Sequence, residues 1–282
     1  SGTESQSVQV GFGEVEHVDR SEGEEIGLRV FVGRRSASVA SSEFSDESLA
    51  ELVKRAIAMA REAPEDLYAG LAPAALLAQG AVPDIGSENH AERDPESLRG
   101  RALGAERAAL AVPFVTNSSG ASAGSSLGTV AIATSTGFSG AYRTTGHSVS
   151  ATVIAGEGAT MQRDHAWHGV RHLENLDPAE AIGRLAGERA VARLNPSRPR
   201  PGRYPVLFDP RVAGTLLGHF AGAITGASVA RKASFLLEKL GHHVFRSGVR
   251  IVDDPLRPRG LRSRPFDAEG LPVAKVSLVD DG

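Results

Sequence analysis

Residues 114–158 constrain the fold more than any other part of the chain, because Ser, Thr, Gly, Ala and Val dominate this stretch. β-Branched side chains favour strands, and strict alternation along a run is typical of a sheet. The clearest strands of the stretch are residues 129–134 and 147–154. We therefore expect antiparallel hairpins with small side chains in this region.

Two extended runs and a helix precede this stretch. Residues 8–18 and 26–39 alternate in polarity, and Gly33 with Arg34 supplies a turn within the second run, which predicts a small antiparallel sheet. Ser45 stands where a helix N-cap is expected, and Pro64 marks the end of that helix. The apolar positions of the predicted helix recur at helical spacing: Leu49, Leu52, Val53, Ala56, Ile57 and Ala60.

A long connection follows this helix. Pro and Gly interrupt residues 64–93 repeatedly, so we expect irregular structure there, with one helical turn around residues 74–78. Asp94 and Pro95 then form a cap and first-turn pair, which predicts an alanine-rich, closely packed helix through about Ala111.

The sequence divides near residue 196. Asp177 and Glu180 have the spacing of a capping box, and the helix they open ends at Pro196. Residues 196–203 are rich in Pro and Arg and are typical of a linker. The predicted domains are therefore an N-terminal α/β domain over residues 1–196 and the start of a C-terminal domain over residues 203–282.

The second domain is expected to open with a strand over residues 204–208. Helices are predicted over residues 210–224 and 228–240, the latter ended by Gly241. The fold class predicted from these patterns is α+β: an N-terminal α/β domain with an antiparallel sheet and flanking helices comes first, followed by the incomplete beginning of a mainly β domain.

Composition excludes several functional classes. The chain of 282 residues has 31 Lys and Arg against 34 Asp and Glu, a net charge of −3, so it lacks the positive surplus of a nucleic-acid binder. The absence of Cys removes disulfides and cysteine-based nucleophiles and zinc sites. No apolar run approaches the roughly 18 residues of a membrane span, and Ser1, Gly2 and Thr3 lack the charged and apolar pattern of a secretory signal. We expect a soluble, cytoplasmic protein without a nucleic-acid or membrane partner.

The two ends of the chain point to a trimmed fragment. The sequence starts without Met, and residues 276–282 resemble a strand entering a turn. We expect the chain to be truncated at both ends.

Three local patterns suggest chemistry. Residues 120–124 match the G-x-S-x-G nucleophile elbow, but the sequence that follows is strand-like, so tight hairpin packing is the favoured interpretation. His165, His168 and His172 would share one face of a helix and could then bind zinc, whereas in an extended chain they would diverge. Surface histidines are the favoured interpretation, and a metal site is the alternative. Six arginines crowd into residues 246–264 with acidic residues among and after them, and these mixed charges favour an ion-paired interface or loop over a nucleic-acid patch.

Several long motifs, in order along nearly the whole chain, resemble the PmbA/TldE family. Near the N-terminus they are residues 27–33 (Gly-Leu-Arg-Val-Phe-Val-Gly) and 64–71 (Pro-Glu-Asp-Leu-Tyr-Ala-Gly-Leu). In the second half they are residues 208–219, 222–227, 230–236, 252–255, 257–260 and 264–270. These proteins have long been described as modulators of DNA gyrase.

The resemblance implies a two-domain protein that pairs with its relative TldD to form a peptidase acting on flexible, unstructured peptides. In TldD one helix carries His-Glu-x-x-x-His, which supplies two zinc ligands and a carboxylate that activates water. The shared residues of that helix place Gly218 at the first His, His219 at the Glu and Ala223 at the second His. Gly and Ala have no donor atom, so the resemblance predicts a chain with no metal, no cofactor and no catalytic residue of its own.

Zinc is then expected in the TldD partner, and metallopeptidase activity only in the complex. This chain would provide structure and a surface that holds an extended peptide by strand addition. Two alternatives stay open: a self-associating scaffold or regulatory homodimer, and an independent metallohydrolase that uses His165, His168 and His172.

Overall fold

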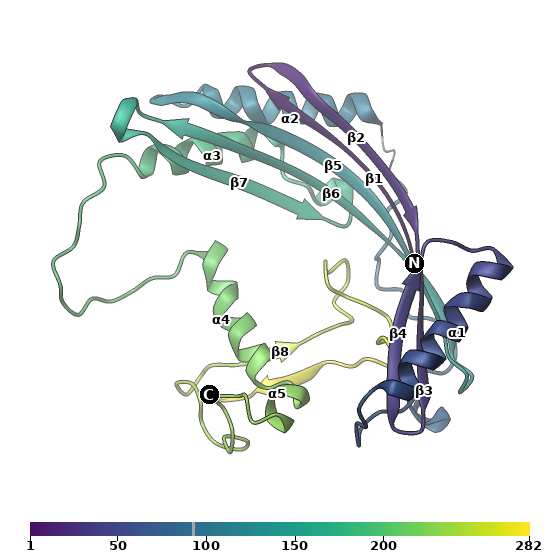
Figure 1. Ribbon diagram of the computed structural model, residues 1–282. Coiled ribbons are helices and arrows are strands. Elements are labelled where there is room, and N and C mark those ends of the chain that lie inside the picture. Colours follow the sequence, from purple (N-terminus) through teal and green to yellow (C-terminus); the bar gives the residue numbers. More distant parts are fainter. Residues whose placement is uncertain (92–93) are drawn as a thin grey trace. The chain divides into compact units, whose positions relative to one another are not determined.

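The computed structural model describes residues 1–91 and 94–282 (Figure 1). The chain forms two compact units, one of residues 1–196 and 254–274 and the other of residues 197–253 and 275–282. The second unit therefore differs from the predicted domain over 203–282, because residues 254–274 pack on the first unit. Phe266 within this segment is buried against Phe138 and Tyr142, at ring-centroid distances of 5.0 and 5.3 Å.

A five-stranded antiparallel sheet forms the body of the first unit. In spatial order its strands are β2 (Glu14–Glu24), β1 (Gly2–Gly11), β5 (Val115–Ala133), β6 (Ser139–Ala155) and β7 (Gln162–Val170). The long β5–β6 hairpin confirms the hairpins predicted from the small residues, and Figure 1 shows how strongly these strands curve. The α+β class predicted from sequence is confirmed.

The N-terminal strands are distributed differently from the prediction. Strands β3 (Ile26–Val32) and β4 (Arg35–Ser41) form a separate hairpin that turns at Gly33, as expected. The preceding hairpin, β1–β2, instead joins the large sheet by pairing β1 with β5. Helix α1 (Asp46–Glu62) contacts β3 and β4, and the Oγ of Ser45 accepts the hydrogen bond of its predicted N-cap from the backbone N–H of Ser48.

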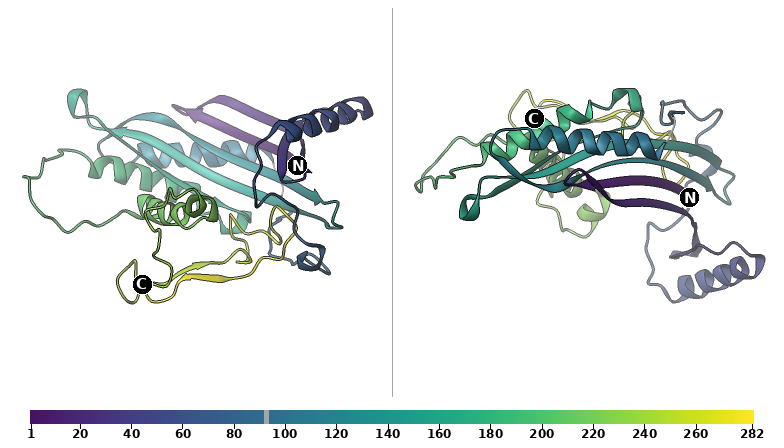
Figure 2. Two further views of the ribbon diagram at one scale, coloured as in Figure 1. Left: turned by 60° about the horizontal axis from the view of Figure 1, so that its bottom comes forward. Right: turned by 90° about the horizontal axis from the view of Figure 1, so that it is seen from above.

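Helices α2 (Pro95–Leu110) and α3 (Ala179–Ala192) pack against each other and on one face of the large sheet (Figure 2). Asp94 caps α2 as predicted. The predicted capping box of α3 is wrong: Pro178 occupies the N-cap without a side-chain bond, and the Asp177 carboxylate lies 3.2 Å from His168 Nδ1 instead. The core between sheet and helices is built mainly from small residues: Val8, Val10, Leu98, Ala102, Ala105, Ala109, Ala121, Ala123, Val149, Ala151, Val153, Ala155, Ala166, Ile182, Ala186 and Ala190.

The opposite face of the sheet carries small polar residues. Over residues 120–128 of β5 and 144–155 of β6, buried residues alternate with half-buried ones. At the β5–β6 turn this second face is covered by an apolar cluster of Ala72, Leu77, Phe138 and Phe266 with Ile132, Tyr142 and Leu271. Among the described helices of this unit, those that pack on the large sheet are α2 and α3, both on the first face.

Short 3₁₀ turns shape the connections of the first unit. The turn η1 (Ala74–Leu76) confirms the single helical turn predicted in the long connection. The turns η2 (Gly158–Thr160) and η3 (Leu173–Asn175) flank β7.

The second unit contains α4 (Pro210–Ala223), α5 (Gly226–Ala230), β8 (Ile251–Asp253) and β9 (Val276–Val279). Helix α4 confirms the prediction for residues 210–224. The predicted strand over 204–208 is wrong, since these residues are irregular and exposed, and the predicted helix over 228–240 ends at Ala230. In both segments large apolar side chains such as Leu207 and Leu240 remain exposed, so no packing holds regular structure. None of the helices in the described residues is long and apolar enough to cross a bilayer.

Candidate functional site

The three positions that the resemblance sets against the TldD zinc motif, Gly218, His219 and Ala223, lie on α4. Gly218 and His219 are exposed, and Ala223 is buried one turn later. Phe220 is buried beside them, with its ring 5.3 Å from that of Phe245 at an angle of 65°. Of these side chains, His219 alone brings an atom that binds a metal.

The glycines of α4 face open space. Glycines such as Gly218 and Gly222 can permit close backbone approach of another element, but a Cβ placed on either would have nothing within 4 Å in the described chain. The apolar residues of the same helix are about half exposed: Val212, Leu216 and Leu217 at 47%, 49% and 54%. Helix α4 therefore presents an apolar, small-residue surface without a cover in the structure.

The three histidines of the alternative metal site do not converge. His165 and His168 lie on strand β7, three residues apart, so their side chains point to opposite faces of the sheet. His168 Nδ1 accepts a hydrogen bond from the backbone N–H of Asp177 at 3.1 Å, and His172 lies beyond the strand. Among residues 1–91 and 94–282, no group of three or more His, Asp or Glu side chains is arranged to hold a metal ion.

The G-x-S-x-G match lies inside strand β5. Ser122 pairs with Ser150 of β6, and their hydroxyl oxygens are 2.9 Å apart. A nucleophile elbow needs a strand-to-helix turn, and here the strand continues to Ala133. The match is thus part of the sheet, as the favoured interpretation expected.

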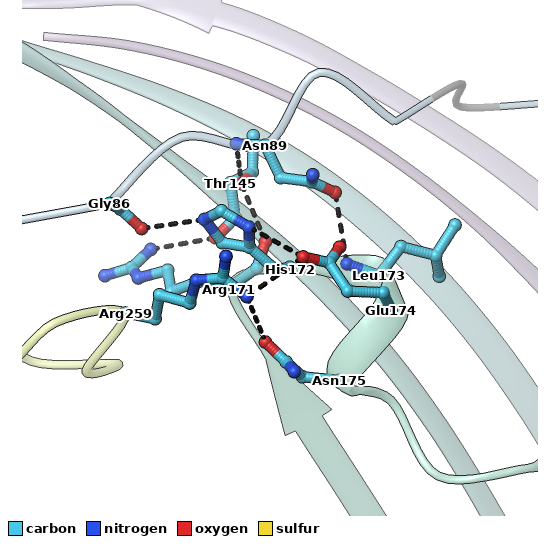
Figure 3. Close-up of polar contacts among 9 residues, drawn as sticks. All are labelled: Gly86, Asn89, Thr145, Arg171, His172, Leu173, Glu174, Asn175 and Arg259. Atoms are coloured by element: carbon cyan, nitrogen blue, oxygen red, sulfur yellow. Dashed lines mark hydrogen bonds and ion pairs between the residues drawn. The ribbon is translucent and has the colours of Figure 1, made fainter.

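A network of polar contacts surrounds His172 at the end of β7 (Figure 3). His172 Nε2 lies 2.9 Å from the carbonyl oxygen of Gly86, and Nδ1 lies 3.3 Å from Glu174 Oε1. Both oxygens are acceptors, so the two ring nitrogens of His172 lie within hydrogen-bond distance of one acceptor each. Arg259 donates to Glu174 Oε1 and to Asn175 Oδ1, each at 2.9 Å.

This arrangement stabilises the ionised form of Glu174. Its own backbone N–H, the hydrogen bond from His172 and the charge of Arg259 together hold the pKa of Glu174 below its ordinary value. Arg259 is fixed in turn, because its backbone N–H donates to the carbonyl of Ile85 at 2.8 Å.

Arg171 joins three separate segments of the first unit. Its guanidinium donates to the carbonyl of Thr145 at 3.0 Å and to that of Leu261 at 2.6 Å. Thr145 donates its hydroxyl proton to the carbonyl of Arg171 at 2.8 Å and accepts from the backbone N–H of Asn89 at 2.9 Å. Burial lowers the pKa of Arg171 from its ordinary value.

The network is a clamp that holds the 85–89 and 257–263 segments on the end of the sheet. Ser87 continues the sheet where β7 ends, since its carbonyl accepts from the N–H of Thr145 and its hydroxyl donates to the carbonyl of Arg143. The hydroxyl of Thr145 is engaged on both sides, which suits positioning and not nucleophilic chemistry. Sequence patterns singled out His172 and the arginine-rich stretch that includes Arg259, but nothing in the sequence indicated that they meet.

A second buried polar site lies on α2. Glu106 is 1% exposed, and its carboxylate accepts from the backbone N–H groups of Phe12 and Gly13 at 2.9 and 2.8 Å. The hydroxyl of Ser118 donates to the same carboxylate. Phe12 and Gly13 form the β1–β2 turn with positive φ angles of 53° and 79°. Glu106 therefore anchors this turn to the helix layer, which is a structural role that sequence reasoning missed.

Comparison with known proteins places the whole chain in one group. Three models of the PmbA/TldA metallopeptidase match it: domain 1 over residues 1–60, the central domain over residues 88–194 and the C-terminal domain over residues 201–282. The metalloprotease PmbA of Escherichia coli is 36% identical over 100% of this chain, and a PmbA homologue of Haemophilus influenzae is 32% identical over 98%. The chain spans 63% and 61% of the length of these relatives.

Solved structures agree on the fold. A candidate modulator of DNA gyrase from Bacteroides thetaiotaomicron superposes with a TM-score of 0.92 at 23% identity, over 100% of this chain and 64% of that protein. TldE from Thermococcus kodakarensis superposes with a TM-score of 0.76 at 18% identity, over 99% of this chain and 63% of that protein.

Proposed function

Because the chain belongs to the PmbA/TldA metallopeptidase family, we propose that it serves as a metal-free, TldE-type subunit of a cytoplasmic TldD/TldE metalloprotease. In this proposal it contributes structure and substrate-binding surface, and the TldD-type partner supplies zinc and the hydrolytic step. The substrate class is flexible, unstructured peptide.

The observation that carries the proposal is the donor set on α4. A structural or catalytic zinc site in a protein takes at least three side-chain ligands from Cys, His, Asp or Glu. Gly218 and Ala223 offer none, and His219 alone, exposed on the helix, cannot hold zinc against water. The residues present do not fit the metal, so no step of hydrolysis is assigned to this chain.

The surface of α4 supports a role in association. Val212, Leu216 and Leu217 expose about half of their side chains along one helix. The neighbouring glycines add no side chain that would keep another protein element away from the helix backbone. An apolar surface of this kind favours contact with another protein element over contact with water.

A peptidase assay tests the proposal. The full-length protein that contains this segment should show no cleavage of an unstructured peptide, alone or with zinc. Together with its TldD-type partner and zinc it should cleave, and a chelator should abolish that cleavage. Brisk, chelator-sensitive cleavage by the protein alone would contradict the proposal.

Metal analysis provides the matched control. The purified protein should contain no stoichiometric zinc, and the triple variant His165→Ala, His168→Ala, His172→Ala should not change its metal content. Stoichiometric zinc lost in that variant would favour the independent metallohydrolase. A stable homodimer that never pairs with TldD in sedimentation experiments would favour the self-associating scaffold.

A further inference from the structure

One stretch in the second half of the chain leaves the second unit and packs on the first. Residues 254–274, which we call the strap, belong to the first unit, whereas residues 197–253 and 275–282 on either side of them form the second unit. The chain therefore passes between the two units at both ends of the strap, in addition to the passage after residue 196. How firmly the strap is held sets how much free chain borders the second unit.

Apolar packing holds the C-terminal part of the strap. Phe266 is 2% exposed, with its ring 5.0 Å from that of Phe138 and 5.3 Å from that of Tyr142. The carbonyl of Gly270 accepts a hydrogen bond of 2.8 Å from the backbone N–H of Ala78. Apolar burial does not depend on charge, so moderate concentrations of salt should leave this part in place.

Polar contacts hold the N-terminal part of the strap, residues 257–263. The guanidinium of Arg259 donates to Glu174 Oε1 and to Asn175 Oδ1 (Figure 3). The side chains of Arg259 and Glu174 are 46% and 55% exposed. Salt screens exposed ion pairs of this kind, and each contributes little to stability. This part of the strap is therefore held less firmly than the apolar part.

The backbone of Arg259 is strained in the docked strap. Its φ angle is 56°, in the left-handed region that is costly for a residue with a Cβ, although a glycine follows it in the sequence. Such a conformation persists only where surrounding contacts enforce it. The enforcing contacts are the bond of 2.8 Å from its own N–H to the carbonyl of Ile85 and the side-chain bonds to Glu174 and Asn175. Detachment of this segment would relax the strain.

We propose that the strap opens in two steps, in which residues 257–263 detach first as a strained latch while the part around Phe266 stays bound. The latch combines exposed, screened contacts with backbone strain, whereas the other part is anchored by a buried aromatic side chain. Opening frees the chain between residue 254 and the anchor. The second unit thus gains freedom at that connection without unfolding of the first.

Hydrogen–deuterium exchange of two backbone amides, followed by mass spectrometry, reports the two parts separately. The N–H of Arg259 is bonded to Ile85 in the latch, and the N–H of Ala78 is bonded to Gly270 in the anchored part. The sample is the full-length protein that contains this segment. When NaCl is raised from about 50 mM to about 500 mM, the Arg259 amide should exchange about two- to fivefold faster, because the ion pair is screened. The Ala78 amide should be unchanged.

Removal of one charge should open the latch without moving the anchor. Glu174→Gln leaves a side chain of the same size without its charge, and it should accelerate exchange at Arg259 about fivefold because the charge-assisted bond is lost. The matched control is Glu188→Gln on α3, which removes an exposed carboxylate 3.8 Å from Arg184 and should leave both amides unchanged. Circular dichroism melting confirms that each variant is folded.

Two substitutions of Arg259 separate the strain from the lost contacts. Arg259→Ala and Arg259→Gly remove the same side-chain bonds, but only the alanine keeps a Cβ in the left-handed conformation. After correction for intrinsic exchange rates, the amide of residue 259 should exchange about fivefold faster in the alanine variant than in the glycine variant.

Three results would overturn the inference. Equal acceleration of both amides in Glu174→Gln would show that the strap moves as one body. An Arg259 amide that does not respond to salt would show that the ion pair does not hold the latch. Equal exchange in the alanine and glycine variants would show that no strain is released. All of these measurements are made without a partner subunit or zinc, so their outcome is independent of the cleavage assay above.

Discussion

Helices α3 and α4 have the same length, 14 residues, yet they occupy opposite environments. Helix α3 packs beside α2 on the sheet, and Ala186 and Ala190 are fully buried. Helix α4 carries larger apolar residues, and Leu216 and Leu217 remain about half exposed. Hydrophobicity alone therefore does not decide burial. What decides it is whether the described chain provides a surface that fits the helix.

The largest expected difference between the two helices comes from a glycine in each. A Cβ on Gly183 of α3 would lie 2.7 Å from the carbonyl carbon of Ala105, so α2 and α3 would have to separate. Gly183→Ala should lower the free energy of unfolding by about 3 kcal/mol, measured by urea denaturation. On α4, Gly218→Ala has free space and should stabilise that helix by about 0.5–1 kcal/mol, because alanine favours helix. Similar effects of the two substitutions would refute the contrast.

The next largest difference in stability is expected between the loss of a buried polar side chain, Glu106, and the loss of an exposed one, His219. Glu106→Ala leaves two turn N–H groups and the Ser118 hydroxyl without their buried acceptor and should cost about 3 kcal/mol in urea denaturation. His219→Ala on α4 removes an exposed side chain and should change stability by less than about 0.5 kcal/mol. Amide exchange of Phe12 and Gly13 should accelerate in the first variant. Unchanged exchange there would show that Glu106 does not anchor the turn.

A smaller difference in stability is expected between the loss of Arg171 in the first unit and the loss of Arg250 in the second. Arg171→Met breaks the bonds to the carbonyls of Thr145 and Leu261 and should lower stability by about 1.5 kcal/mol. Arg250→Met in the second unit removes only an exposed pair with Asp280 at 3.6 Å and should cost less than about 0.5 kcal/mol. Thermal melting measures both, and an equal loss would mean that the clamp adds nothing beyond a surface ion pair.

The smallest effect is electrostatic. The pKa of Glu174 is lowered from its ordinary value of 4.5, so its ionised form favours the folded state above that pH. This contribution is lost as the pH falls through the lower, folded-state pKa. Arg259→Ala should raise the pKa of Glu174, as followed by carbon NMR of the carboxyl group during a pH titration. In the second unit, backbone and Ser247 bonds lower the pKa of Asp281 likewise, and Arg259→Ala should leave that pKa unchanged.

Local signals predicted most of the regular elements. Ser45 and Asp94 cap the helices expected of them, and the turn at Gly33 lies where the alternation broke. Each of these features depends on residues within a few positions of one another. The capping box at Asp177 failed because Pro178 occupies the N-cap, and the backbone N–H of Asp177 donates to His168 Nδ1 of β7.

Segments in the second unit were harder to predict. Residues 204–208 are mostly apolar and aromatic and were expected to form a strand. A strand needs a neighbour to satisfy its backbone groups, and these residues have no ladder partner in the described chain. The helical pattern of residues 228–240 ends early, with Lys232 and Glu238 at φ angles of 56° and 62° and Phe235 74% exposed. Periodicity indicates which face could be buried, but packing supplies most of the stability of a helix.

By itself the sequence determined the α+β class, the main hairpin, and the caps of α1 and α2, because each of these is encoded in neighbouring residues. Only the tertiary structure decided that β1 pairs with β5, that Arg259 meets Glu174 and His172, and that residues 254–274 pack on the first unit. The physical reason is distance along the chain: contacts between remote segments are selected by the packing of the whole unit, and no local pattern records them.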